Sequence, residues 1–112
     1  MKYYYALYWD EKLIPKKEEV LKKLKNSELQ FEKYLIVLSK SENNHLELFN
    51  TVLLIQKAIP TEELFVVGIT NGYQEALEIV EKITQEVYDE TKGTDIKKYI
   101  LQKQQEYEKG NV

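Results

Sequence analysis

The stretch IVLSKSENNHLELFN, from Ile36 to Asn50, decides how this chain is folded. One apolar run ends at residue 38, a polar segment occupies residues 39–45, and a second apolar run begins at residue 46. We interpret the polar segment as a strand-to-helix loop, because Asn44 suits a helix N-cap and Glu47 stands three residues later, as in a capping box. The second apolar run then predicts a helix over residues 45–59, which Pro60 ends.

On either side of this stretch, the sequence predicts three strands and three further helices. Continuous or alternating apolar runs indicate strands over residues 2–9, 29–39 and 63–70. Amphipathic patterns indicate helices over residues 15–26, 71–93 and about 94–108. In the long helix, the apolar side of the wheel carries Tyr73, Ala76, Leu77, Ile79, Val80, Ile83, Val87 and Tyr88.

The resulting order β-α-β-α-β-α-α is typical of an α/β protein. With 112 residues, we expect a single domain over residues 1–112. Alternating strands and helices predict a small three-stranded, mainly parallel sheet with the helices packed on it. Such a sheet has two open edges, and pairing between two copies of the chain would protect them.

The composition excludes several kinds of chemistry. The chain has no cysteine, one histidine and no arginine, and its net charge is −3. These counts exclude disulfides, thiol catalysis and zinc–thiolate sites, and they remove the guanidinium group that proteins use for bidentate phosphate binding and guanine recognition. We therefore predict no metal, no cofactor and no specific nucleic acid. No apolar run is long enough to span a membrane, so we expect a soluble, cytoplasmic protein without a membrane partner.

In an open parallel sheet, ligands bind beyond the carboxyl ends of the strands, where loops and helix N-termini meet. The predicted topology brings three loops to that end. Their ligand-binding candidates are Asp10, Ser39, Asn43, His45, Asn71, Gly72 and Tyr73. The cluster would suit a small molecule or a phosphate-containing ligand.

No known catalytic motif marks this cluster. Gly68 and Gly72 match neither the dinucleotide-binding fingerprint nor the P-loop. A Ser-His-acid triad could be drawn from Ser39 or Ser41 with His45, but no G-x-S-x-G elbow surrounds either serine. We assign no catalytic residue. Two interpretations of His45 stay open: a ligand-binding group, or a hydrogen-bonding residue at the start of a helix.

The predicted helix over residues 45–59 is apolar around about two-thirds of its circumference. A small sheet covers only one side of a helix, so this pattern predicts a contact with a partner. The interface candidates are Leu54, Gln56 and Ala58. We therefore expect a small protein-interaction domain that self-associates through this helix or through a sheet edge. The alternative is a ligand-binding domain or enzyme that uses the loop cluster.

Overall fold

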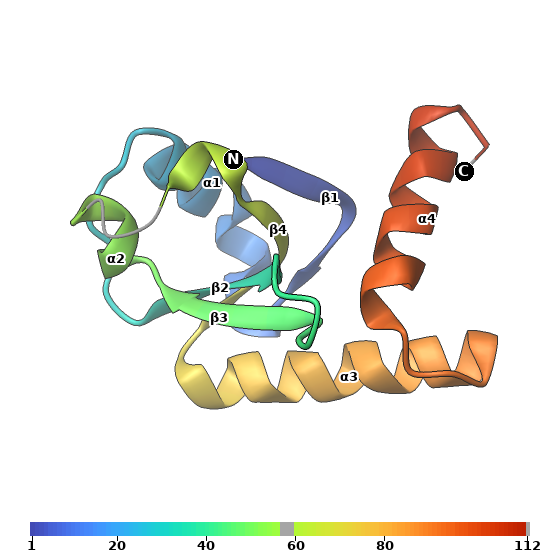
Figure 1. Ribbon diagram of the computed structural model, residues 1–112. Coiled ribbons are helices and arrows are strands. Elements are labelled where there is room, and N and C mark those ends of the chain that lie inside the picture. The colour runs from blue at the N-terminus through green and yellow to red at the C-terminus, as the bar shows by residue number, and fades with distance from the viewer. Residues whose placement is uncertain (57–59, 112) are drawn as a thin grey trace.

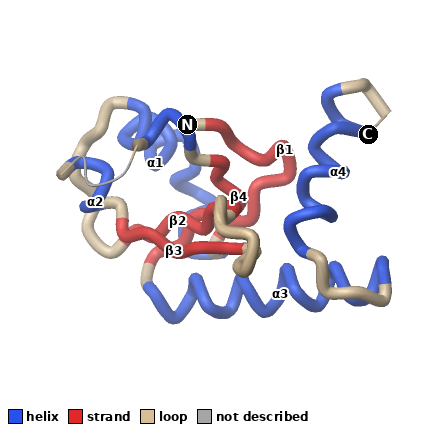
Figure 2. The backbone as a smooth tube through the Cα atoms, viewed as in Figure 1, coloured by secondary structure: helices blue, strands red, loops and turns tan. Residues whose placement is uncertain are grey.

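The computed structural model describes residues 1–56 and 60–111 (Figure 1). Within these residues, a single sheet has helices on both of its faces (Figure 2). Its strands are β1 (Lys2–Trp9), β2 (Lys33–Leu38), β3 (Leu46–Asn50) and β4 (Phe65–Asn71). The helices are α1 (Lys17–Lys25), α2 (Val52–Ile55), α3 (Tyr73–Thr91) and α4 (Ile96–Glu108), with 3₁₀ turns η1 (Glu11–Lys16) and η2 (Thr61–Glu63). None of the described helices combines the length and apolar character that crossing a membrane requires.

The sheet is four-stranded and mixed, with the strand order β1-β4-β2-β3. Only β1 and β4 are parallel. Strand β2 runs antiparallel to both of its neighbours, β4 and β3. The prediction of a three-stranded, mainly parallel sheet in β-α-β-α-β-α-α order is therefore wrong, both in the number of strands and in their direction.

The error lies in the stretch Ile36–Asn50, which forms a β-hairpin. The N–H of Ser39 donates to the carbonyl oxygen of His45 at 2.9 Å and closes this hairpin. Glu47 does not cap a helix, because its carboxylate accepts a hydrogen bond from Ser39 Oγ across the hairpin at 2.9 Å. Helices cover both faces of the sheet, so the neighbouring residues Leu48 and Phe49 of β3 can both be apolar although they point to opposite faces. The apolar sequence of this segment therefore resembles that of a buried helix.

A turn at Asn50 and Thr51 divides the predicted helix into a strand and a short helix. Asn50 Oδ1 accepts from the N–H of Val52 at 3.0 Å, and Thr51 Oγ1 donates to the carbonyl oxygen of Gln30 at 2.9 Å. Such side-chain bonds offer the backbone an alternative to a continuing helix. Helix α2 consequently covers only Val52–Ile55.

Two hydrophobic clusters fill the space on the two faces of the sheet. The first packs η1, α1 and α2 against one face, and its buried members are Leu13, Val20, Leu24, Leu35, Val37, Leu54, Leu64, Val66 and Ile69. The second packs α3 and α4 against the other face, and its buried members are Tyr4, Val67, Ile83, Val87, Ile96 and Ile100. The long helix α3 thus lies across the face opposite α1 and α2 (Figure 1).

Candidate functional site

The mixed sheet separates the predicted ligand cluster into two groups. Asp10, Asn71, Gly72 and Tyr73 lie together, because β1 and β4 are parallel and end at the same side of the sheet. Strand β2 runs antiparallel to β4, so its carboxyl end lies at the opposite side of the sheet. Ser39, Asn43 and His45 are found there, in and beside the β2–β3 hairpin.

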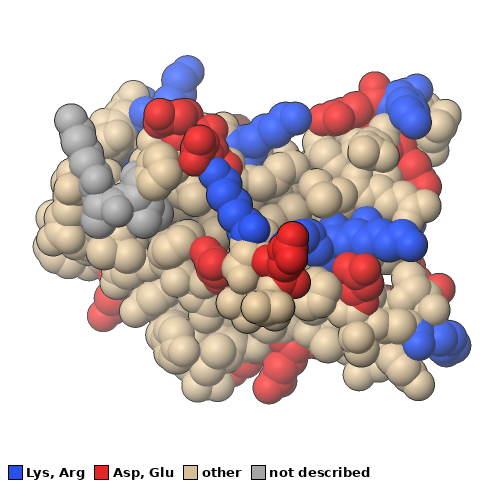
Figure 3. Space-filling model, viewed as in Figure 1, with Lys and Arg blue, Asp and Glu red and all other residues tan. Residues whose placement is uncertain are grey.

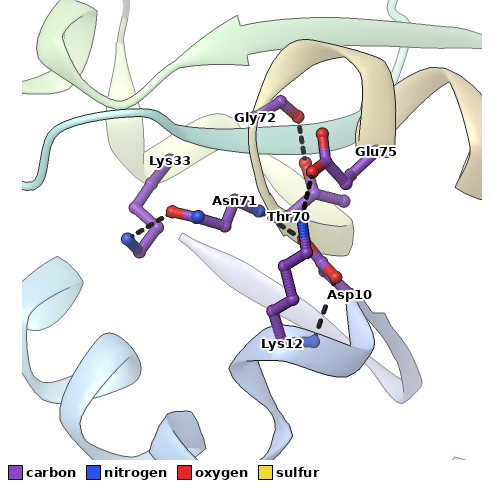
Figure 4. A network of polar contacts seen from close by, with 7 residues as sticks. All are labelled: Asp10, Lys12, Lys33, Thr70, Asn71, Gly72 and Glu75. Carbon is purple, nitrogen blue, oxygen red and sulfur yellow. Dashed lines mark hydrogen bonds and ion pairs between the residues drawn. The ribbon is translucent and has the colours of Figure 1, made fainter.

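At the ends of β1 and β4, the carboxylate of Asp10 joins the two strands (Figure 4). Asp10 is buried, with 7% of its surface exposed. Its Oδ1 accepts from the N–H of Lys12 at 3.1 Å, and its Oδ2 accepts from the N–H of Asn71 at 3.0 Å. A carboxylate that accepts backbone N–H groups in this way fixes the chain where β1 turns into η1.

The neighbouring side chains complete this network (Figure 4). Lys33 Nζ donates to Asn71 Oδ1 at 2.7 Å, and Lys12 Nζ pairs with Glu75 Oε2 at 2.8 Å. The hydrogen bond between Lys12 and Glu75 raises the pKa of the lysine and lowers the pKa of the carboxyl. Thr70 Oγ1 donates to the carbonyl oxygen of Gly72 at 3.0 Å.

Open hollows adjoin this network. One is lined by Trp9, Asp10, Glu11, Lys12, Gln74, Glu75, Glu78, Ile79 and Lys82, and another by Lys12, Glu32, Tyr34, Asn50, Asn71, Gly72, Tyr73, Gln74 and Glu75. Within the network, the Asp10 carboxylate, the Lys12 and Lys33 ammonium groups and the Glu75 carboxylate each already have a partner. These contacts therefore hold β1, β4 and the start of α3 together. Among the described residues, no three His, Asp or Glu side chains gather closely enough to hold a metal ion.

His45 contacts α4 from the hairpin. Its Nδ1 accepts a hydrogen bond from the N–H of Lys97 at 3.2 Å. Lys97 belongs to the first turn of α4, where backbone N–H groups have no partner within the helix. The ammonium of Lys97 returns to the hairpin and donates to the carbonyl oxygen of Ser41 at 2.8 Å. His45 therefore fastens the β2–β3 hairpin to the start of α4, while Asn43 is exposed in the hairpin loop.

The interface candidates lie in or beside α2. Leu54 is buried in the first hydrophobic cluster, with 7% of its surface exposed. Gln56 is exposed and forms the C-cap of α2. Ala58 lies outside the described residues.

The outer edge of β3 carries backbone groups that no other strand pairs with in the described part of the chain. The N–H of Ser39 reaches the carbonyl of His45, and the N–H of Thr51 reaches the carbonyl of Lys33 at 3.0 Å. Because backbone direction alternates along a strand, the odd-numbered residues 45–51 face β2 and the even-numbered ones face away. The outward N–H and C=O groups belong to Leu46, Leu48 and Asn50; we call this row the β3 edge.

Beside the β3 edge, one side of α3 leaves apolar and aromatic side chains uncovered. This side, which we call the α3 flank, consists of the exposed residues Tyr73, Leu77 and Tyr88 and the partly buried Val80 and Thr84, which together recur at helical spacing. The ring of Tyr73 lies 5.6 Å from that of Tyr34 on β2, which places the flank on the β2–β3 side of the helix. Tyr73, Leu77 and Tyr88 are 53%, 36% and 49% exposed.

The β3 edge and the α3 flank share one face of the molecule. Leu46 packs against the cluster that contains Ile83 and Val87 of α3, so Leu46 and Leu48 lie on the α3 side of the sheet. Both elements lie toward the viewer in Figure 1, and the same view in Figure 3 shows few charged side chains over them. Lys, Asp and Glu gather above this face and to its right (Figure 3).

Sequence reasoning missed the β3 edge, although two signals mark it. The residues of HLELFN partly alternate, and the Asn-Thr pair after them is a poor helix interior. The α3 flank left a clearer signal. The apolar side of the helical wheel contains eight residues, whereas only Ala76, Ile83 and Val87 of α3 are buried.

Comparisons of the chain with protein-family models, with curated proteins and with solved structures found no match. The functional argument therefore depends on the fold and on the chemistry of its surfaces.

Proposed function

We propose that this chain is a cytoplasmic protein-interaction domain that binds an extended segment of a protein as an additional strand beside β3. The observation that carries this proposal is the row of outward N–H and C=O groups at Leu46, Leu48 and Asn50. Exposed sheet edges bind peptides in this way, with backbone hydrogen bonds supplying affinity and alternate side chains supplying specificity.

The side chains beside the β3 edge define which segments fit. On the α3 side, Leu46, Leu48 and the α3 flank form an apolar surface. On the other side, Glu47 and Phe49 alternate with them. A bound strand should therefore place apolar residues at every second position, toward α3, and polar residues at the positions between them.

The β3 edge is favoured over the ends of β1 and β4 as the functional surface. At those ends the polar groups are joined to one another through Asp10, Lys12 and Asn71. At the β3 edge, the backbone groups of Leu46, Leu48 and Asn50 face away from the sheet, in a five-residue strand without proline. Proteins commonly protect such edges with proline, lysine or a covering helix.

Amide hydrogen exchange measured by NMR tests this proposal. Peptides selected for binding from a displayed random library should slow the exchange of the Leu46, Leu48 and Asn50 amides. The amides of Glu47 and Phe49 face β2, so they should be protected with or without peptide. Selected peptides that protect amides elsewhere and leave the β3 edge unchanged would contradict the proposal.

A matched pair of variants sharpens the test. Leu48→Lys places a charge on the edge strand, and it should weaken peptide binding by about tenfold or more. Ile14→Lys introduces the same charge at a 49% exposed site in η1, away from the edge, and it should leave binding unchanged. Equal loss in both variants would show that net charge, and not the edge, controls binding.

A further inference from the structure

The β3 edge is complementary to itself. An antiparallel partner strand must place its own outward residues opposite Leu46, Leu48 and Asn50. If the two-fold axis passes through Leu48, the Leu48 residues of the two copies face each other, and each Leu46 faces the other copy's Asn50. All three outward residues of each copy then exchange hydrogen bonds, for about six N–H···O bonds in total.

The charge of Glu47 selects this register from the symmetric alternatives. A two-fold axis at Glu47 would put the Glu47 carboxylates of the two copies directly opposite each other, which is destabilising. An axis at Phe49 would leave the outward groups of Leu46 without a partner. With the axis at Leu48, each Glu47 lies opposite a Phe49, and no like charges of β3 meet.

The same two-fold axis turns the α3 flanks of the two copies toward each other. Asn50 is paired with Tyr34, whose ring contacts Tyr73 at the start of α3. From Asn50, Leu48 lies about 7 Å back along β3. From Tyr73, Leu77 lies about 6 Å along α3 in the corresponding direction. An axis perpendicular to the sheet at Leu48 therefore lies level with Leu77 along the strand direction, and the two α3 helices lie on the same face of the joined sheet.

A stable dimer needs more buried area than the β3 edge alone offers, which supports an interface made by both the β3 edge and the α3 flank. A specific interface buries about 800 Å² on each partner, which is roughly a ninth of the 7215 Å² exposed by this chain. A strand of five residues is too short to supply that area alone. The α3 flank adds the exposed surfaces of Tyr73, Leu77 and Tyr88 on the same side.

We infer that the occupant of the β3 edge is a second copy of this chain. The two β3 strands pair antiparallel about a two-fold axis at Leu48, which joins the two sheets into one, and the α3 flanks pack against each other. This inference rests on the proposed function, because it names the partner that adds the strand. The sequence predicts self-association through the helix over residues 45–59 or through a sheet edge; this inference uses a sheet edge and adds the side of a different helix, α3.

Single cysteines test the register, because the chain has no cysteine of its own. Each symmetric register places a different residue on the axis, and a cysteine on the axis faces its own copy. The Cα atoms of such a pair are about 5.5 Å apart at Leu48, which would form a hydrogen-bonded pair, and about 4.5 Å apart at Glu47 or Phe49, and a disulfide can span either distance. Leu48→Cys should form a covalent dimer on mild oxidation, whereas Glu47→Cys, Phe49→Cys and the exposed control Ile14→Cys should not. Cross-linking of Glu47→Cys or Phe49→Cys alone would overturn the register.

The solution mass of the unmodified chain tests the occupant. Sedimentation of samples at increasing concentration should reach twice the chain mass of 13.3 kDa by about 0.1 mM. Leu77→Glu should raise the dissociation constant by about tenfold or more, and the control Leu101→Glu, at a 43% exposed site on α4, should not. A monomer throughout this range overturns the inference. The proposed function then stands if selected peptides still protect the β3 edge, and fails as well if they do not.

Discussion

The backbone N–H of Tyr5 donates a hydrogen bond of 2.8 Å to Gln104 Oε1, which joins β1 to α4. This bond forms where β1 leaves its ladder with β4, between the pairs made by Tyr3 and Tyr8. Nearby, the ring of Tyr107 stacks on that of Tyr5 at 4.5 Å. The two outer strands of the sheet therefore differ: α4 packs on β1 and bonds its backbone through Gln104, whereas the outer edge of β3 pairs with no other strand in the described residues.

Replacing Gln104 should destabilise the fold. Gln104 is buried against β1, so Gln104→Ala leaves the N–H of Tyr5 without its acceptor. This loss should lower the free energy of unfolding by about 1–3 kcal/mol. Urea unfolding followed by circular dichroism measures this change. The matched control is Gln105→Ala, at an exposed position of the same helix, which should change the free energy of unfolding by less than about 0.5 kcal/mol. Equal effects would show that the bond to Tyr5 contributes nothing.

Replacing Asp10 should also destabilise the fold, because its carboxylate holds two backbone N–H groups. Asp10→Ala should lower the free energy of unfolding by about 2–3 kcal/mol, and Asp10→Asn by less, since an amide keeps one acceptor oxygen. The control Glu11→Ala changes an exposed neighbour and should be nearly neutral. If Asp10→Ala lowers the free energy of unfolding no more than the control does, the network at the ends of β1 and β4 does not hold the strands together as its contacts indicate.

The elements could largely be predicted from the sequence, but their pairing could not. The predicted strand over residues 2–9 coincides with β1, and the long helix predicted over residues 71–93 contains α3. Local patterns carry this information. The direction of β2 depends on whether residues 39–45 lead into a helix or return as a hairpin. An apolar run that is covered on both faces does not distinguish these outcomes, because its periodicity fits either one.

The candidate sites show the same limit. Asp10 and Asn71 meet because they follow the two strands that are parallel. Ser39 and His45 lie at the other end of the sheet because β2 is antiparallel to β4. Two local signals mark the strand β3, but its place at the edge of the sheet was beyond sequence reasoning, since an unpaired edge is a property of the strand order. The α3 flank was within its reach, as an apolar arc wider than the sheet covers.

Gly72 should tolerate no side chain, because its backbone has a φ of 116° and a ψ of 153°. Only glycine adopts this conformation readily, so Gly72→Ala should cost about 1–3 kcal/mol. The new Cβ would also lie 2.6 Å from Glu75 Oε1, forcing that side chain to move and disturbing its pair with Lys12. Gly93→Ala is the control, since its Cβ would meet only Thr91 Oγ1 at an ordinary 3.5 Å. Thermal unfolding of both variants distinguishes backbone strain at Gly72 from a general effect of removing glycine.

Alkaline pH should unfold the protein through the tyrosines between β1 and α3. Burial raises the pKa of Tyr4, and burial together with the hydrogen bond from Tyr8 Oη to Glu86 Oε2, at 2.5 Å, raises the pKa of Tyr8. In the unfolded chain these phenols ionise near pH 10. Above that pH the unfolded state binds fewer protons than the folded state, so stability falls as pH rises. Below pH 10 both states keep their phenol protons, and this contribution to stability is fully present.

Tyr4, the buried one of these two tyrosines, gives the size of this loss of stability. Tyr4 is 4% exposed, and as long as it stays protonated in the folded state it lowers the free energy of unfolding by about 1.4 kcal/mol for each pH unit above 10. Urea unfolding between pH 8 and 12 measures this slope, with phenolate absorbance as the second signal. Tyr8→Phe removes one titrating group, so it should lower stability at pH 8 through the lost bond to Glu86 and make the alkaline slope shallower. Because the chain has nine tyrosines, the signal of Tyr8 is taken as the phenolate absorbance of the unchanged chain minus that of Tyr8→Phe. A difference signal that appears before the helical signal is lost would contradict the prediction, because Tyr8 would then ionise within the folded protein.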